Sequence, residues 1–229
     1  RGLVLPTLPA EFETQALTPV YLAGRGKLRG VFGLRDQPRP ESVEVVRELK
    51  SLGITLVMAS GDREAPVRAM ARETGIEEAH AGLVPEQKLA LVRNYQTRGV
   101  VGFVGDGLND APSLAAANVG LAIGSGADAA KENTDLVLAG HDLRVLPFAI
   151  RLARATLAKI RQNLAWAVVY NLAALPLAAG ILAPFLGPRW SLTPEVAGLA
   201  MAFSSVSVVA NSLLLRAAAF AAVVRRERA

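Results

Sequence analysis

Residues 105–110 form a segment whose side chains could hold a divalent cation. The segment reads Gly-Asp-Gly-Leu-Asn-Asp and directly follows a short apolar run that ends at Val104. A helical pattern comes next, so we expect the segment at the carboxyl edge of a sheet, where α/β proteins bind ligands. Glycines allow a tight turn there, and carboxylate and amide oxygens suit Mg²⁺. The residues that carry this prediction are Gly105, Asp106, Gly107, Asn109 and Asp110.

Two other segments add phosphate-binding groups. Ser60, Gly61 and Asp62 follow an apolar run over residues 54–59 and offer a hydroxyl and a flexible backbone amide, which can cradle a phosphoryl oxygen. Lys88 lies near the start of the helical pattern that begins at Pro85, where its charge would offset that of a transferring phosphoryl group. Together with residues 105–110, these segments predict a phosphoryl-transfer site.

Short apolar runs alternate with helical patterns through this part of the chain. Partly β-branched runs predict buried strands, and apolar residues at i, i+3 spacing predict helices. The strands are expected over residues 30–34, 54–59, 100–104, 119–123 and 136–138, and the helices over 41–52, 65–74, 85–98 and 110–117. The pattern predicts an α/β domain with a parallel sheet covered by helices.

The last third of the chain has the composition of a membrane protein. Residues 164–186 and 196–215 are two apolar stretches, each near the ~20 residues that cross a bilayer. Arginines and lysines lie before the first stretch and after the second, which predicts that both ends are cytoplasmic. The sequence thus predicts a transmembrane helical hairpin, with a buried helix pair in a soluble protein as the alternative.

Polar residues inside an apolar stretch often mark a pathway or a contact between helices. Tyr170 and Asn171 lie in the first stretch, and Met201, Ser204 and Ser205 lie in the second. Methionine suits a soft monovalent cation, although it also fills gaps in packing. The chain has no cysteine, which excludes disulfides and thiolate ligands within it. Its net charge of +5 does not predict nucleic-acid binding, because the basic residues form no recognisable binding motif.

The order Ser-Gly-Asp, Pro-x-x-Lys, Gly-Asp-Gly-x-Asn-Asp-Ala-Pro resembles the phosphorylation domain of P-type ATPases. The resemblance runs from about Tyr21 to Arg216 and implies a haloacid-dehalogenase-like Rossmannoid parallel sheet, here incomplete, followed by the transmembrane hairpin. It implies that Asp106 and Asp110 organise Mg²⁺ and that Lys88 and Asn109 orient and neutralise the phosphoryl group. Phosphate binding would fall to Ser60, Gly61, Asp62, Gly105 and Gly107.

The family's Asp-Lys-Thr-Gly-Thr segment, which supplies the phosphorylated aspartate, does not occur in these 229 residues. We therefore expect the chain alone to be inactive, and its partner to be the missing N-terminal portion of the pump, which would also bind most of the ATP. Position 60 carries serine where the family usually has threonine, and Arg63 is a further departure without an assigned consequence.

The motifs Tyr170-Asn171 and Met201-x-x-Ser204-Ser205 resemble those of the copper(I)-transporting subgroup of heavy-metal pumps. The resemblance implies copper bound by Tyr170, Asn171, Met201 and Ser204, in a multi-pass protein of a bacterial inner or cell membrane with a cytoplasmic soluble domain. Zinc and cadmium pumps are expected to carry a lysine and an aspartate in these helices, and neither stretch has a charge. The alternatives are a zinc or cadmium pump, a split or truncated assembly partner without catalytic activity, and a membrane-anchored phosphatase.

The predicted organisation has seven parts. These are residues 1–19 as the end of a nucleotide-binding domain or a linker, 20–145 as the phosphorylation domain, 146–163 as a cytoplasmic connecting helix, 164–186 as a transmembrane helix, 187–195 as an external loop, 196–215 as a second transmembrane helix and 216–229 as a cytoplasmic tail.

Overall fold

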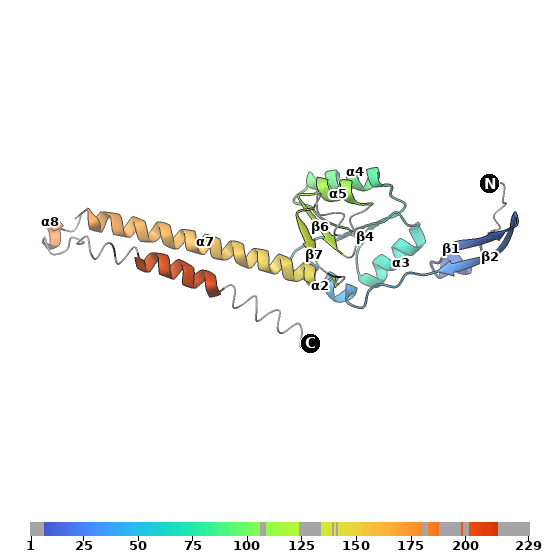
Figure 1. The fold of residues 1–229 in the computed structure, drawn as a ribbon, viewed down its shortest axis with the longest axis horizontal. Coiled ribbons are helices and arrows are strands. Elements are labelled where there is room, and N and C mark those ends of the chain that lie inside the picture. The colour runs from blue at the N-terminus through green and yellow to red at the C-terminus, as the bar shows by residue number, and fades with distance from the viewer. Residues whose placement is uncertain are drawn as a thin grey trace. The chain divides into compact units, whose positions relative to one another are not determined.

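The computed structural model describes residues 7–105, 109–123, 134–138, 140, 142–179, 183–187, 198 and 202–214. The chain divides into two compact units, Arg1–Pro147 and Phe148–Ala229 (Figure 1). The first unit contains the α/β elements, and the second contains most of one long helix and the helices that follow it.

The first unit begins with a short helix, α1 (Glu11–Thr14), and an antiparallel hairpin of β1 (Thr18–Gly24) and β2 (Lys27–Leu34). The hairpin turn has φ of 52° at Arg25 and 72° at Gly26. Two positive φ values in a two-residue turn match the twist of the flanking strands, so the chain folds straight back. Our prediction that residues 30–34 join the parallel sheet was wrong, because this turn pairs them with β1.

Five short strands form two parallel sheets in the same unit. β3 (Val57–Ala59) pairs with β4 (Glu78–His80), and β6 (Val119–Ile123) lies between β5 (Gly102–Gly105) and β7 (Leu136–Leu138). Four of these strands confirm the predicted apolar runs. Among the described residues, β3 and β5 each pair with one strand only, so each keeps one open edge.

Four helices follow the predicted pattern closely: α2 (Ser42–Ser51), α3 (Glu64–Thr74), α4 (Pro85–Gln96) and α5 (Ala111–Ala116). Gly75 ends α3 with φ of +80°, a conformation that glycine adopts without a Cβ penalty. Most of the buried apolar side chains come from these helices, strands β6 and β7 and the start of the long helix: Val45, Leu49, Val67, Ala71, Val92, Leu114, Leu121, Ala122, Leu138 and Leu146. They give the α/β unit its core.

The long helix α7 (Val145–Ala178) joins the predicted connecting helix to most of the first predicted span. α8 (Ala183–Leu186) and a helix over residues 202–214 follow it. Among the residues that the structure describes, no helix is both long and apolar enough to cross a membrane. The predicted hairpin is therefore not confirmed, and residues 180–182, 188–197, 199–201 and 215 of it lie outside the described residues.

Candidate functional site

Ser60 follows β3, and both its backbone N–H and its backbone carbonyl form hydrogen bonds. Its N–H donates to the His80 carbonyl at 2.9 Å, and its own carbonyl accepts from the Leu83 N–H at 3.0 Å. The Ser60 hydroxyl donates to Asp62 Oδ2 at 2.9 Å and accepts from the Asp62 N–H at 3.1 Å. The loop is thus fixed against the segment that leads into α4, with its backbone turned tightly around the serine.

Gly61 lies where a larger residue would press on this same segment. A Cβ atom at position 61 would lie 3.3 Å from the Leu83 carbonyl oxygen, which is tighter than most such contacts. Gly61 and Asp62 are exposed, whereas Ser60 is half-buried. The loop therefore presents an accessible backbone and a carboxylate around one hydroxyl.

Lys88 and Asp110 form an ion pair between α4 and the start of α5. Lys88 Nζ donates to Asp110 Oδ1 at 2.8 Å, and each side chain is 15% exposed. Lys88 lies in the first turn of α4, which is capped by the Gln87 side chain accepting from the Val84 N–H at 3.0 Å. The Asp110 carbonyl begins α5 by accepting from the Ser113 and Leu114 N–H groups, both at 2.9 Å. The starts of these two helices thus hold the two charges together.

Gly105, the last residue of β5, fits against Asp110. A Cβ at position 105 would lie 2.9 Å from Asp110 Oδ2 and 3.0 Å from its Cβ, closer than real Cβ atoms approach their neighbours. Only glycine lets the Asp110 carboxylate lie against the carboxyl end of β5. Gly105 and Asp110 therefore lie in contact at the carboxyl end of β5.

The cation-binding prediction is only partly covered by the structure. Asp106 and Gly107 lie outside the described residues, and Asn109 is exposed beside Asp110. The described residues contain no cluster of three or more histidine, cysteine or acidic side chains suited to a metal. The oxygen donors at this edge, the Asp110 carboxylate and the adjacent Asn109 amide, are of the type that Mg²⁺ prefers.

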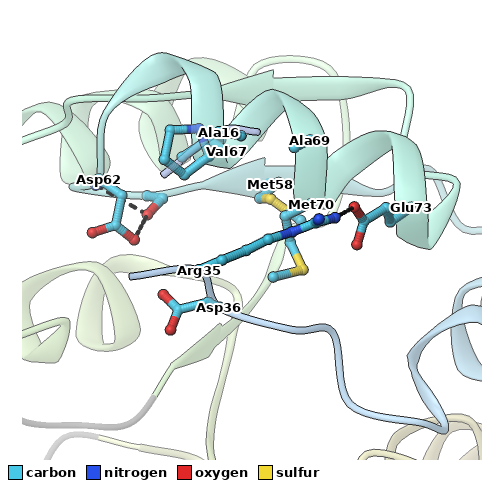
Figure 2. A pocket seen from close by; sticks show the side chains of 11 residues that line it. Ala16, Arg35, Asp36, Met58, Asp62, Val67, Ala69, Met70 and Glu73 are labelled. Atoms are coloured by element: carbon cyan, nitrogen blue, oxygen red, sulfur yellow. Dashed lines mark hydrogen bonds and ion pairs between the residues drawn. The ribbon is translucent and has the colours of Figure 1, made fainter. Parts of the chain in front are cut away.

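A small pocket of about 70 Å³ opens beside the Ser60 loop and includes Asp62, Arg35 and Asp36 in its lining. Figure 2 shows Arg35 extending past Met70 to its ion pair with Glu73, while Asp62 lies at the other end of the pocket. Arg35 and Asp36 directly follow β2. Neither residue was predicted from the sequence, although a charged pair immediately after a strand could have marked them.

The predicted metal ligands of the second unit are only partly described. Tyr170 and Ser204 are half-buried, on α7 and on the helix over residues 202–214, and Asn171 is exposed. Met201 lies outside the described residues.

The chain is similar to proteins that are already known. Residues 5–118 match the family model of the haloacid dehalogenase-like hydrolases. The chain is 49% identical over 207 residues to the probable copper-transporting ATPase PacS of Synechococcus elongatus, and 46% identical over 206 residues to the probable copper-exporting P-type ATPase of Archaeoglobus fulgidus. The chain thus contains a haloacid dehalogenase-like hydrolase domain and is similar, over most of its length, to copper-transporting P-type ATPases.

A solved structure is similar over most of the chain as well. A crystal structure of a zinc-transporting PIB-type ATPase in the E2.Pi state matches with a TM-score of 0.73 and 36% identity, over 90% of this chain and 32% of the other. The match supports the haloacid-dehalogenase-like α/β parallel-sheet fold. The aligned regions are 90% of this chain but only 27% of the Synechococcus protein and 25% of the Archaeoglobus protein, so the chain spans about a quarter of these relatives.

Proposed function

We propose that this chain carries half of the phosphoryl-transfer site of an ATP-driven copper(I)-exporting P-type ATPase. The observation that carries the proposal is the Lys88–Asp110 pair, which lies at the carboxyl end of β5, next to an open strand edge. Lys88 would contribute positive charge to the phosphoryl group, and the Ser60 hydroxyl with the Gly61 amide would bind its oxygens.

The nucleophile would come from a strand that this sequence does not contain. β3 ends at the Ser60 loop and β5 ends at Gly105, and among the described residues both strands keep one unpaired edge. In a parallel sheet, a strand added at such an edge would bring its own carboxyl end beside these loops. We propose that the Asp-Lys-Thr-Gly-Thr segment of a pump's remaining portion supplies this strand, and that its aspartate accepts and then loses the phosphoryl group.

Mg²⁺ would neutralise charge on the phosphoryl oxygens, held by Asp110 and Asp106 with Asn109 beside them. Lys88 already compensates the Asp110 charge at 2.8 Å, so its ammonium would also keep that carboxylate oriented toward the end of β5. ATP itself would be bound mainly by the portion of the pump that this chain does not include.

Copper(I) is the proposed cargo, and Tyr170, Asn171, Met201 and Ser204 are its proposed ligands within this chain. The two relatives described above, named copper-transporting and copper-exporting, are 49% and 46% identical, whereas the zinc-transporting structure is 36% identical. In such a pump, α7 and the helix over residues 202–214 would be part of a multi-pass membrane protein, and the α/β unit would be on the cytoplasmic side.

The test fuses this chain to the remaining N-terminal portion of the Synechococcus relative and measures metal-stimulated ATP hydrolysis in lipid. We expect stimulation by copper(I) and silver(I) but not by zinc(II), and loss of activity in the Lys88→Ala and Tyr170→Phe variants. Stimulation by zinc(II) alone would instead identify a zinc pump, and a fusion that no metal stimulates would contradict transport by this chain.

A further inference from the structure

In the second unit, α7 and the helix over residues 202–214 meet along one stripe of each helix. Figure 1 shows the two helices side by side and running in opposite directions. The half-buried residues recur at spacings of three and four, which places them on one helical face. Between residues 159 and 174 of α7 they are Lys159, Asn163, Ala167, Tyr170 and Ala174, and on the other helix they are Ser204, Val208 and Asn211.

Asn211 is the centre of the polar part of this contact. Its Oδ1 accepts a hydrogen bond from Lys159 Nζ at 2.7 Å. Its Nδ2 donates to Asn163 Oδ1 at 2.7 Å and to Gln162 Oε1 at 3.1 Å. One amide therefore contacts three side chains on two successive turns of α7.

Two further hydrogen bonds complete the network. Asn163 Nδ2 donates to Ser212 Oγ at 2.9 Å, and Lys159 Nζ also donates to Gln162 Oε1 at 3.2 Å. The side-chain amides of Asn211 and Asn163 thus both form hydrogen bonds between the two helices. A shift of one helix by a turn would break these bonds and leave the half-buried ammonium without the Asn211 oxygen.

The remainder of the stripe offers little to oppose such a shift. Ala167, Ala174 and Val208 are small or apolar side chains without directional contacts. Residues of this kind can exchange neighbours at modest cost, whereas a single buried asparagine is a well-attested device for fixing the register of two helices. The polar network is therefore the part of the contact that can select one register.

This register has a consequence for the proposed metal ligands. Tyr170 lies seven residues beyond Asn163 on α7, and Ser204 lies seven residues before Asn211. Seven residues are two helical turns, or about 10 Å. Because the helices are antiparallel, the same offset along both brings Tyr170 and Ser204 to the same level of the stripe.

We propose that Asn211 is a positioning residue, which locks α7 to the helix over residues 202–214 in the register that makes Tyr170 and Ser204 face each other across one copper(I) site. Lys159 and Asn163 are its partners in this role. The inference rests on the proposed function, because it assigns a purpose to the register only if these two side chains bind the cargo.

The register can be measured directly because the chain has no cysteine. Leu175→Cys and Leu213→Cys place spin labels at two exposed positions of the full chain in lipid nanodiscs. Without further substitutions, pulsed electron paramagnetic resonance should give one narrow distribution of distances between the two labels. Asn211→Leu should broaden it and add a component displaced by about 5 Å, one helical turn. Asn211→Asp keeps the acceptor for Lys159 but loses both donated hydrogen bonds, so it should give a smaller displaced component than Asn211→Leu.

Ser207→Ala is the matched control, because the Ser207 hydroxyl donates to the Ser204 carbonyl of its own helix at 2.8 Å. It should leave the distance unchanged. Silver(I) serves as the metal probe: Asn211→Leu should weaken silver(I) binding to the full chain about tenfold, the lower end of the effect seen when a ligand-orienting partner is lost, while Ser207→Ala stays near the parent.

An unshifted, narrow distance in Asn211→Leu would overturn the inference, and so would a shifted register with unchanged silver(I) affinity. If the parent chain binds no silver(I) at all, the proposed copper site itself fails and the positioning role fails with it. If the parent chain binds silver(I) and Asn211→Leu binds it equally well, only the positioning role of Asn211 is rejected.

Discussion

Removing Lys88 tests whether the α4–α5 ion pair organises the site. Lys88→Met leaves the Asp110 carboxylate, 15% exposed, without its ammonium at 2.8 Å. Loss of one partner costs about 3–5 kcal/mol in a fully buried pair, and exposed pairs contribute about 0–1 kcal/mol. This pair lies between those limits, so we expect the α/β unit to lose about 2 kcal/mol of its free energy of unfolding.

Hydrogen exchange of peptides covering α4 and α5, measured in increasing urea on the full chain, reports this loss. Asp110→Asn keeps the backbone carbonyl that begins α5 and removes only the charge. Combining it with Lys88→Met should recover part of the stability, because no unpaired charge then remains. Losses below about 0.5 kcal/mol in both single variants, with additive effects in the double variant, would refute the pairing.

Two further predictions concern the sheet edge and an exposed cluster. Gly105→Ala should destabilise the unit by about 1–3 kcal/mol, because its Cβ would lie 2.9 Å from Asp110 Oδ2, whereas Gly102→Ala, with its nearest contact at 3.7 Å, should change the urea midpoint much less. Hydrogen bonds from Tyr95 and then His80 hold the pKa of Glu78 below its usual value. A lowered carboxyl pKa contributes stability that is present above the unfolded-state value and is lost as pH falls through the folded one. Tyr95→Phe should therefore reduce the acid-induced fall in stability, as followed by urea titrations at several pH values, and an identical pH dependence in Tyr95→Phe would contradict the contact.

Much of the α/β unit could be predicted because its signals are local. The helix that starts at Pro85 and the strand over residues 119–123 lie where the apolar patterns placed them. β4 was missed because Glu-Ala-His carries no apolar run, and its strand form depends on pairing with β3. Such a strand exists only through a non-local contact, which no short window of sequence contains.

The candidate site was predictable in its residue types but not in its contacts. Lys88 and Asp110 were both expected near a phosphoryl group, yet their sequence spacing did not predict that they bond to each other. The network around Asn211 was missed for a similar reason. Serine and asparagine in an apolar helix indicate a polar contact, but the partners, Lys159 and Asn163, are set by the register of two helices far apart in sequence.

The most direct test of the account is transfer of the γ-phosphoryl group of ATP. Radiolabelled ATP is given to the N-terminal portion of the Synechococcus relative, alone and coexpressed with this chain in lipid. We predict that an acid-stable, hydroxylamine-sensitive label forms on the N-terminal portion only when this chain is present, and that Lys88→Ala abolishes it while Ser207→Ala does not. Label on this chain itself, or equal labelling of the N-terminal portion without it, would contradict the claim that this chain contributes half of the site.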